Sequence, residues 1–449
     1  MKKLFGTDGV RGVANQELTC ELAMNIGRAA GIVLSEYCHR KPTFLIGKDT
    51  RISSDMLENA LVAGICSVGA DAVILGTIST PAVAVLVNKY KADAGFMISA
   101  SHNPMEYNGI KIFNNDGYKL PSDLEKKIEL LIHKEEFCLK LGDELGKVSI
   151  QKNAQQDYIN YIIETIGCDE LPKIKVALDC ANGSASVTAR KLFQSLNIDC
   201  LLINDKPNGI NINDKCGSTH MEAISQFTTE NNCDIGIAFD GDADRCLIVD
   251  ENGEIVDGDK IMAIMATHLK QQGKLAKNTV VVTTMSNLGL IKMAKDKDIR
   301  IETTDVGDRY VLEKMVEEGY SIGGESSGHI ILLDHITTGD GQLVAIHFLT
   351  MMKKLGLKVS ELSKIMTICP QVLINVKIPN SKKYKILDCR DISCKIDEYE
   401  KELGDDGRIL LRPSGTEPLV RIMVEGIDKD KISAIATDLS NVVKESLGI

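Results

Sequence analysis

Three aspartates crowd into one short segment of this chain. Asp240, Asp242 and Asp244 alternate within the run Asp-Gly-Asp-Ala-Asp-Arg, directly after the apolar residues 235–239. Neighbouring carboxylates repel one another and raise each other's pKa unless a cation lies among them. Hard divalent cations prefer oxygen ligands, so the cluster indicates a magnesium or calcium site. A solvated acidic turn is the alternative that the spacing alone leaves open.

A calcium loop of the EF-hand type explains this spacing only in part. Glu251 lies where such a loop, counted from Asp240, has its last ligand. Arg245, however, occupies the position that requires glycine. The flanking segments 235–239 and 246–249 have the composition of strands, whereas an EF-hand needs helices. The pattern therefore argues against an EF-hand.

A second polar loop, residues 98–104, follows another apolar segment and contains Ser101 beside His102. A hydroxyl next to an imidazole is weak evidence for a nucleophile and its base, and an ordinary Ser/Asn turn is the alternative. Lys111 follows shortly afterwards and could handle a proton or hold a phosphate near the serine. The loop is therefore a candidate catalytic loop.

Three further segments combine glycines with groups that bind anions or sugars. The segment 412–418, Arg-Pro-Ser-Gly-Thr-Glu-Pro, offers amides, hydroxyls and a guanidinium that suit a phosphate monoester, with Arg421 shortly beyond. The segment 323–329 mixes a carboxylate, hydroxyls and glycines, which suits sugar hydroxyls. Arg11 lies in the glycine-rich stretch 5–12. Each segment, taken alone, is also compatible with a polar turn.

Buried strands and amphipathic helices must position these loops. Their repeated order predicts an α/β protein with three consecutive similar α/β domains and mixed, mainly parallel sheets. We expect strands at 43–47, 72–75, 95–98, 174–178, 201–203, 234–239, 280–282, 299–302 and 321–322, and helices at 54–68, 186–196 and 288–294. Each group of strands ends in one of the polar loops, and ligands favour the carboxyl ends of strands in such sheets.

The last part of the chain has a different pattern. Strands are expected at 372–378, 408–411 and 419–424, and a helix at 430–447, which predicts a C-terminal α+β domain with an antiparallel sheet. A chain of 449 residues is too long for one core. We expect four domains, at 1–152 with the serine loop, 153–252 with the metal-binding loop, 253–368 with the sugar-binding loop and 369–449 with the phosphate-binding loop.

Composition limits the classes of partner. The formal net charge of −11 argues against nucleic-acid and anionic-membrane binding. Thirteen cysteines without a C-x-x-C pair, and a start without the apolar stretch of a signal peptide, favour a cytoplasmic protein with reduced thiols. No apolar run has the length of a membrane span. Neither kind of glycine-rich nucleotide loop is present, so ATP is not the expected phosphoryl donor.

Four motifs, taken in order, resemble the signature of the α-D-phosphohexomutases over essentially the whole chain. They are Ser-His-Asn-Pro at 101–104, the aspartate run at 240–245, Gly-Glu-Ser-Ser-Gly-His at 324–329, and residues 412–418. Within that family, the segments 5–12, 213–220 and 306–311 are similar to the bacterial branch that acts on glucosamine phosphate. Ser326 departs from the commonest family pattern, in which glutamine is frequent.

This resemblance implies an isomerase, an intramolecular phosphotransferase that interconverts glucosamine 6-phosphate and glucosamine 1-phosphate on the route to UDP-N-acetylglucosamine and the cell wall. Ser101 would be a phosphoserine that gives its phosphoryl group to the sugar, forms a sugar bisphosphate, and recovers the other phosphoryl group. One Mg²⁺ would be held by Asp240, Asp242, Asp244 and a phosphate oxygen on Ser101. The implied catalytic residues are Ser101, His102, Lys111 and Arg11, and the implied substrate contacts are Arg245, Glu325, Ser327, Arg412, Ser414, Gly415, Thr416 and Arg421.

Two other functions remain open on the sequence. A phosphomannomutase or phosphoglucomutase would use the same machinery on a sugar that differs at its second carbon. A non-catalytic calcium- or sugar-phosphate-binding protein would bind its ligand without forming a phosphoserine. The expected partner is a small sugar phosphate, with the sugar bisphosphate as intermediate or activator. The general base, the source of the first phosphoryl group and the oligomeric state stay open, with a homodimer among the options.

Overall fold

A computed structural model describes residues 4–6, 8–36, 38, 40–167, 169, 171, 173–379, 382–383, 386, 389–413 and 418–447. The chain forms two compact units. The first consists of Met1–Met285 and Asp298–Ile365, and the second of Ser286–Lys297 and Met366–Ile449. Within the described residues, three sheets belong to the first unit and one sheet to the second.

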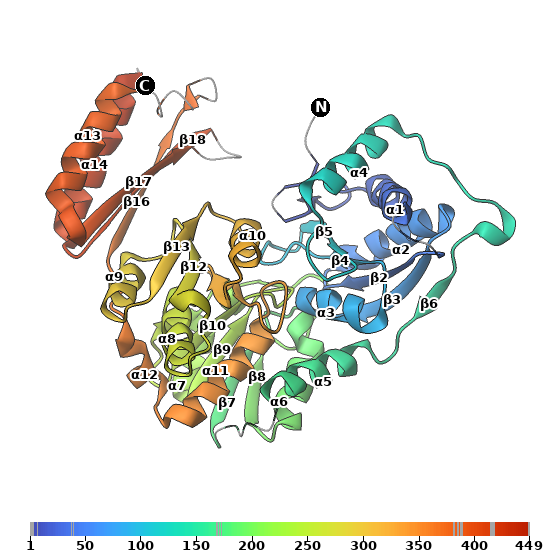
Figure 1. The fold of residues 1–449 in the computed structure, drawn as a ribbon, viewed down its shortest axis with the longest axis horizontal. Helices are drawn as coiled ribbons and strands as arrows, with labels where there is room; N and C mark the ends of the chain where they lie inside the picture. Colours follow the sequence, from blue (N-terminus) through green and yellow to red (C-terminus); the bar gives the residue numbers. More distant parts are fainter. Residues whose placement is uncertain are drawn as a thin grey trace. The chain divides into compact units, whose positions relative to one another are not determined.

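The first sheet has the strand order β1-β5-β4-β2-β3-β6. Its strands are β1 (Val10–Val13), β2 (Thr43–Lys48), β3 (Asp71–Thr77), β4 (Ala94–Ile98), β5 (Tyr107–Asn114) and β6 (Val148–Ile150). Helices α1 (Cys20–Ser35), α2 (Ile52–Ser67) and α4 (Ser122–Lys134) lie on one face, and α3 (Thr80–Tyr90) lies on the other (Figure 1). Every residue of β4 is buried, because helices cover both faces of the sheet.

The second and third sheets follow along the chain. The second has the order β11-β10-β9-β7-β8 and consists of β7 (Lys175–Asp179), β8 (Asp199–Ile203), β9 (Ile235–Phe239), β10 (Cys246–Asp250) and β11 (Ile255–Val256). The third has the order β13-β12-β14-β15 and consists of β12 (Thr279–Thr283), β13 (Arg300–Thr304), β14 (Ile322–Gly324) and β15 (Ile330–Leu332). Their helices are α5 (Ala154–Ile166), α6 (Ala189–Ser195), α7 (Glu222–Glu230), α8 (Gly258–Gln271), α10 (Asp308–Glu318), α11 (Gly341–Leu355) and α12 (Val359–Leu362).

The three sheets share one arrangement. Each contains three parallel strands in which the first along the chain lies between the other two, giving β4-β2-β3, β9-β7-β8 and β14-β12-β13. An antiparallel strand then pairs with the third parallel strand, as β5, β10 and β15 do. The loop between those two strands carries Ser101 in the first sheet, Asp240 in the second and Glu325 in the third. The three predicted site loops therefore occupy equivalent positions.

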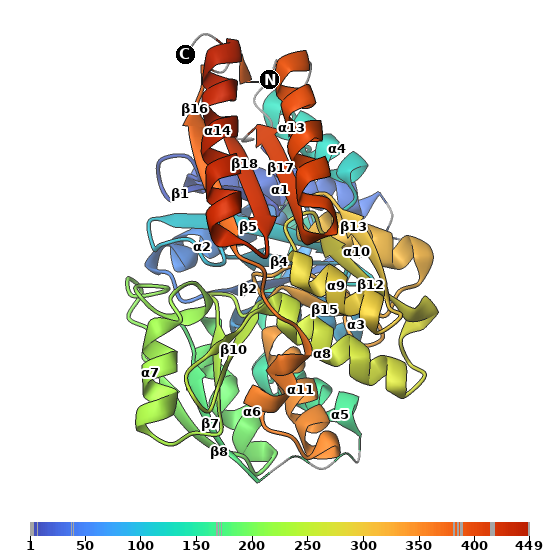
Figure 2. The same cartoon turned by 90° about the vertical axis from the view of Figure 1, so that its left-hand side faces the viewer.

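The second unit has a different sheet, made of β16 (Gln371–Lys377), β17 (Gly407–Pro413) and β18 (Leu419–Gly426), which are antiparallel in the order β16-β18-β17. Figure 2 shows α13 (Arg390–Leu403) and α14 (Lys429–Leu447) side by side along this sheet. Exposed residues alternate with more buried ones along β16, as expected for a strand with one covered face. Helix α9 (Leu288–Asp296) belongs to this unit as well.

The predicted fold class is confirmed by these sheets. Two local predictions were wrong. The helix expected at 186–196 starts only at Ala189, because Thr188 has a non-helical φ of −120° and a short 3-10 turn precedes it. Lys111 lies on strand β5, which was not predicted. The four domain boundaries stay predictions.

Two further observations concern the described part of the chain. None of its helices combines the length and the apolar character that crossing a lipid bilayer requires. Its cysteines are all free thiols.

Candidate functional site

Ser101 lies in the loop between β4 and β5 and is almost fully buried. Its φ of +52° is left-handed, a conformation that costs an L residue about 1–2 kcal/mol. The Ser101 hydroxyl donates a hydrogen bond of 2.6 Å to Oδ2 of Asp240, which follows β9. Its backbone amide donates to the Ser99 hydroxyl at 2.9 Å. The structure thus brings the predicted serine loop against the predicted aspartate loop.

The aspartate cluster is buried and compact. Asp240, Asp242 and Asp244 each offer a carboxylate oxygen, and these oxygens lie within 4.8 Å of one another. Burial, and then the charges of Asp244 and Asp242, raise the pKa of Asp240 well above its ordinary value. Within the described chain, Oδ1 of Asp242 is buried without a hydrogen-bond partner. A buried oxygen without a partner, in a set of oxygen donors, fits a hard divalent cation.

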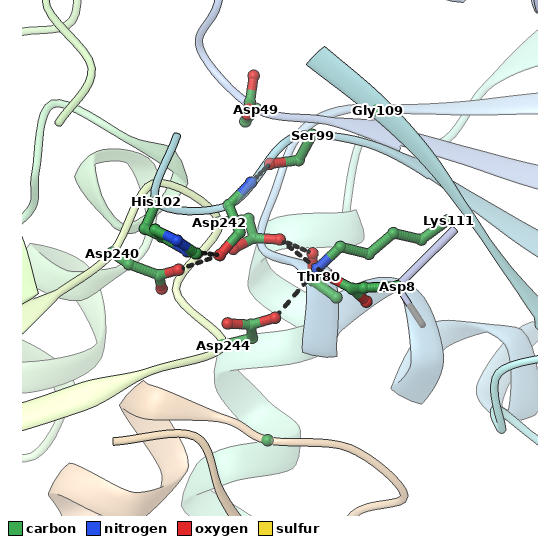
Figure 3. A network of polar contacts seen from close by, with 12 residues as sticks. Asp8, Asp49, Thr80, Ser99, His102, Gly109, Lys111, Asp240, Asp242 and Asp244 are labelled. Carbon is green, nitrogen blue, oxygen red and sulfur yellow. Dashed lines mark hydrogen bonds and ion pairs between the residues drawn. The ribbon is translucent and has the colours of Figure 1, made fainter. Parts of the chain in front are cut away.

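Lys111 reaches this cluster from β5, as Figure 3 shows. Its Nζ lies 2.9 Å from Oδ2 of Asp242, 3.1 Å from Oδ2 of Asp244 and 3.1 Å from Oδ2 of Asp8. Burial alone would lower the pKa of Lys111, but the charges of Asp242, Asp244 and Asp8 outweigh it and raise the pKa well above the ordinary value. The ammonium group therefore stays charged and neutralises part of the cluster.

Further charged residues extend this contact into a closed ring across the three sheets of the first unit. Lys119 forms ion pairs with both Asp8 and Asp308. His329 lies with Nε2 3.4 Å from Oδ2 of Asp308 and with Nδ1 3.6 Å from Oδ1 of Asp244. The members of this ring, in order, are Asp244, Lys111, Asp8, Lys119, Asp308 and His329.

Sequence reasoning assigned no role to Asp8, Lys119 or Asp308. Asp8 and Asp308 lie in the segments 5–12 and 306–311, which carried the family resemblance. That resemblance was the one feature of the sequence that could have pointed to these two residues. Lys119 lies in no motif.

Three other predicted residues lie in or near the serine loop. Arg11 donates through Nη1 to Oδ1 of Asn103 at 3.2 Å and pairs with Asp8. His102 has its Nδ1 3.4 Å from the Ser101 hydroxyl. Burial, followed by the charges of Arg245 and Arg11, lowers the pKa of His102 to about 4, so its ring is neutral at pH 7. The Arg245 amide donates to Oδ1 of Asp240 at 3.2 Å.

The third loop contains the predicted sugar contacts. Glu325 accepts a hydrogen bond of 3.1 Å from the Gly307 amide, and the Ser327 hydroxyl lies 3.5 Å from the other Glu325 oxygen. The Cys246 amide donates to the Gly328 carbonyl at 3.0 Å, which joins this loop to the start of β10. Loops from all three sheets of the first unit therefore meet.

The second unit holds the predicted phosphate-binding residues. Arg412 on β17 lies directly opposite Arg421 on β18. Burial, and then the charge of Arg421, lower the pKa of Arg412. Like charges directly opposite each other on paired strands are unfavourable, so this pair suits an anion. The segment 412–418 was predicted to lie between two strands, but Arg412 and Pro413 belong to β17 itself. Ser414, Gly415 and Thr416 lie outside the described residues.

Comparison with protein families gives four consecutive matches. All carry the description phosphoglucomutase/phosphomannomutase. The alpha/beta/alpha domains I, II and III match residues 2–138, 156–253 and 257–368, and the C-terminal domain matches residues 373–442.

Individual proteins are similar along the whole length. A curated phosphoglucosamine mutase of Ruminiclostridium cellulolyticum is 55% identical over 449 residues, covering 100% of both chains. A crystal structure of a phosphoglucomutase/phosphomannomutase family protein from Burkholderia thailandensis has a TM-score of 0.83 at 22% identity, covering 99% of this chain and 97% of that one. N-acetylphosphoglucosamine mutase of Aspergillus fumigatus, solved with GlcNAc-6P and magnesium, has a TM-score of 0.66 at 16% identity, covering 99% and 96%. At these identities the two solved structures show a common fold.

Proposed function

Because this chain belongs to the phosphoglucosamine mutases, a branch of the phosphoglucomutase/phosphomannomutase family, we propose that it interconverts glucosamine 6-phosphate and glucosamine 1-phosphate. The product would feed the synthesis of UDP-N-acetylglucosamine and the cell wall. One observation carries the mechanism: the Ser101 hydroxyl lies 2.6 Å from a carboxylate of the aspartate cluster. A phosphoryl acceptor and a candidate cation site are thereby combined in one buried place. We also propose a cytoplasmic location, because the described cysteines are free thiols.

The reaction would proceed in two transfers. With a phosphoryl group on Ser101, the bond from phosphorus to the serine oxygen breaks while a bond to the free sugar hydroxyl forms, and that hydroxyl loses its proton as the serine oxygen gains one. The resulting sugar bisphosphate reorients. Its other phosphoryl group then returns to Ser101, whose hydroxyl loses a proton as the released sugar oxygen gains one. The net result moves the phosphate between the two positions of the sugar.

His102 is proposed to take part in the proton movement at Ser101, since its Nδ1 lies 3.4 Å from the hydroxyl. Lys111 and Arg11 are held as cations by carboxylates. We propose that they stabilise phosphate charge and orient the loop.

Asp240, Asp242 and Asp244 would hold Mg²⁺ together with a phosphate oxygen on Ser101. When bound, this ion would neutralise negative charge that develops during phosphoryl transfer. The magnesium solved with the Aspergillus fumigatus relative supports this choice of ion. The chain itself already neutralises part of the cluster through Lys111.

Substrate contacts are proposed on two sets of residues. Glu325 and Ser327 offer carboxylate and hydroxyl oxygens to sugar hydroxyls, with Arg245 near their loop. Arg412 and Arg421, with Ser414, Gly415 and Thr416, would bind the phosphate that does not react. The adjacent guanidinium groups of Arg412 and Arg421 support this assignment.

The test is turnover with Mg²⁺ and a trace of glucosamine 1,6-bisphosphate, compared among glucosamine, glucose and mannose 6-phosphates. We expect kcat/KM to favour the amino sugar by at least about tenfold, which is about 1.4 kcal/mol of transition-state discrimination. Peptide mapping by mass spectrometry should find phosphate on Ser101. A clear preference for mannose or glucose would contradict the proposed substrate.

Ser101→Ala should lower turnover at least about a thousandfold, because the phosphoryl acceptor is lost. Ser53→Ala is a suitable control, since the Ser53 hydroxyl accepts from Asn108 at 2.9 Å and belongs to none of the proposed site residues. Full activity in the Ser101 variant would rule out the proposed mechanism.

A further inference from the structure

Two side chains, from segments that connect the elements of different sheets, donate hydrogen bonds to the backbone of the serine loop. The Ser101 carbonyl accepts from Nη2 of Arg51 at 3.1 Å and from Nδ2 of Asn213 at 2.9 Å. The Asn103 carbonyl accepts from the same two nitrogens, at 3.0 Å from Asn213. Two donors therefore hold the same two carbonyls, one on each side of His102. The orientation of the Asn213 amide follows from these contacts, because only its nitrogen can donate to carbonyl oxygens.

Both donors are themselves held firmly. Arg51 precedes α2 and forms a fully buried ion pair with Asp49. Asp49 also accepts from the Arg51 amide at 3.0 Å and from the Ser54 hydroxyl at 2.9 Å. Asn213 lies on the segment between β8 and α7, and its φ is +57°. Its backbone N–H donates to the Ala181 carbonyl at 2.9 Å. Neither donor is a flexible surface side chain.

The aspartate loop packs directly against the Ser101 carbonyl and the side chain of Asn213. A Cβ atom added at Gly241 would lie 2.5 Å from the Ser101 carbonyl oxygen and 2.9 Å from Nδ2 of Asn213. Only glycine permits so close an approach. Gly241 separates Asp240 from Asp242, so the contact lies between two of the proposed metal ligands. The position of the serine carbonyl and the position of the carboxylates are therefore fixed against each other.

We propose that Asn213 and Arg51 are positioning residues for phosphoryl transfer. By holding the carbonyls of Ser101 and Asn103, they keep Ser101 in its left-handed conformation, with its hydroxyl facing Asp240. Without these donors, the peptide after Ser101 is free to rotate toward an ordinary conformation, which turns the hydroxyl away from the carboxylate. This inference rests on the proposed function, and it gives a role to the start of the segment 213–220.

The test compares Asn213→Ala with Asn211→Ala. Asn211 lies in the same segment, and its side-chain amide donates to the Lys206 carbonyl at 3.1 Å, away from the serine loop. The measured quantity is the rate at which glucosamine 1,6-bisphosphate with Mg²⁺ phosphorylates Ser101 in a single turnover, followed by intact-protein mass. We expect Asn213→Ala to be slower by about 10- to 100-fold with a nearly unchanged apparent affinity for the bisphosphate. Asn211→Ala should react at nearly the unchanged rate.

Two further variants separate positioning from stability. Asn213→Asp keeps the shape but presents carboxylate oxygens to the two carbonyls, so it should be slower than Asn213→Ala. Arg51→Lys keeps the charge opposite Asp49 but loses the forked donors, so it should also be slow. If the rates of all four variants merely follow their melting temperatures, or if Asn213→Ala reacts as fast as Asn211→Ala, the inference is wrong.

A failure of the proposed function is recognised separately, because the unchanged protein would then not be phosphorylated on Ser101 at all. In that event a crystal structure of Asn213→Ala tests the structural step of the inference, that the two donors hold the Ser101 conformation. A Ser101 φ that leaves the left-handed region, with loss of the contact to Asp240, supports it. An unchanged Ser101 conformation overturns it.

Discussion

Lys111 places its ammonium nitrogen 2.9 Å from Oδ2 of Asp242, inside the group of carboxylates that we propose as metal ligands. Both side chains are almost fully buried. The lysine comes from the first sheet and the aspartate from the loop after β9, so the pair joins two sheets. Buried charges are tolerated only when opposite charges lie close, and this pair meets that condition.

Replacing Lys111 with methionine should therefore destabilise the protein strongly. Lys111→Met leaves buried carboxylates without their cation, which typically costs about 3–5 kcal/mol. Saturating Mg²⁺ should restore more stability in the variant than in the unchanged protein, because a bound cation supplies the missing charge. Chemical denaturation with and without Mg²⁺ measures both effects. Lys354→Met is the control: its pair with Asp169 lies at the surface, and we expect a loss of about 1 kcal/mol or less.

Asp242→Asn should weaken cation binding. The substitution removes one of the three carboxylate charges, and we expect Mg²⁺ or Mn²⁺ affinity to fall by at least about tenfold. Calorimetric titration of the purified protein measures the affinity. Asp205→Asn, at a surface ion pair with Arg190, should bind the ion normally. Equal affinities in the two variants would show that the cluster is not the cation site.

Asp340 should make stability depend on pH. Burial raises its pKa to about 7, although the Leu343 amide and the Tyr158 hydroxyl favour the charged form. Because the folded pKa exceeds the ordinary value of 3.8, the folded protein holds a proton that unfolding releases. The resulting stabilisation is present below about pH 4 and is lost as the pH rises through 7, and it amounts to at most about 4 kcal/mol.

Asp340→Asn removes this titration, while asparagine can still cap α11. We expect the variant to be more stable than the unchanged protein at pH 8 and nearly equal to it at pH 4. Unfolding free energies measured across this range give the comparison. Parallel profiles for the two proteins would contradict the assignment.

Glu425 should anchor α9 within the second unit. It is fully buried and accepts from the Leu288 amide at 2.9 Å, from Gln371 at 2.9 Å and from Nε of Arg408 at 2.6 Å. Glu425→Ala leaves these donors without their acceptor, and we expect a loss of about 3–5 kcal/mol. Amide exchange should rise across α9. Lys292→Ala removes only a surface pair with Asp406 and should leave that exchange nearly unchanged.

The strands and several helices followed from local patterns. β9 was predictable because a run of apolar residues precedes the aspartates. In the structure all five residues of this strand are buried, as expected where both faces of a sheet are covered. Strand β5 was missed because Asn108 and Gly109 favour turns, yet pairing with β1 holds them in a strand. Tertiary pairing overrode local preference there.

The sequence by itself determined which loops carry chemistry, because Ser101 and the three aspartates lie in contiguous motifs directly after apolar strands. Only the tertiary structure decided that Lys119, Asp308 and Asn213 join them. Each is a single polar residue to which no pattern assigned a role, and its partners lie far away along the chain. A pattern of apolar residues encodes burial, but it does not encode which buried surfaces meet. The order of strands in three similar sheets decides that, by placing the three loops where their side chains can touch.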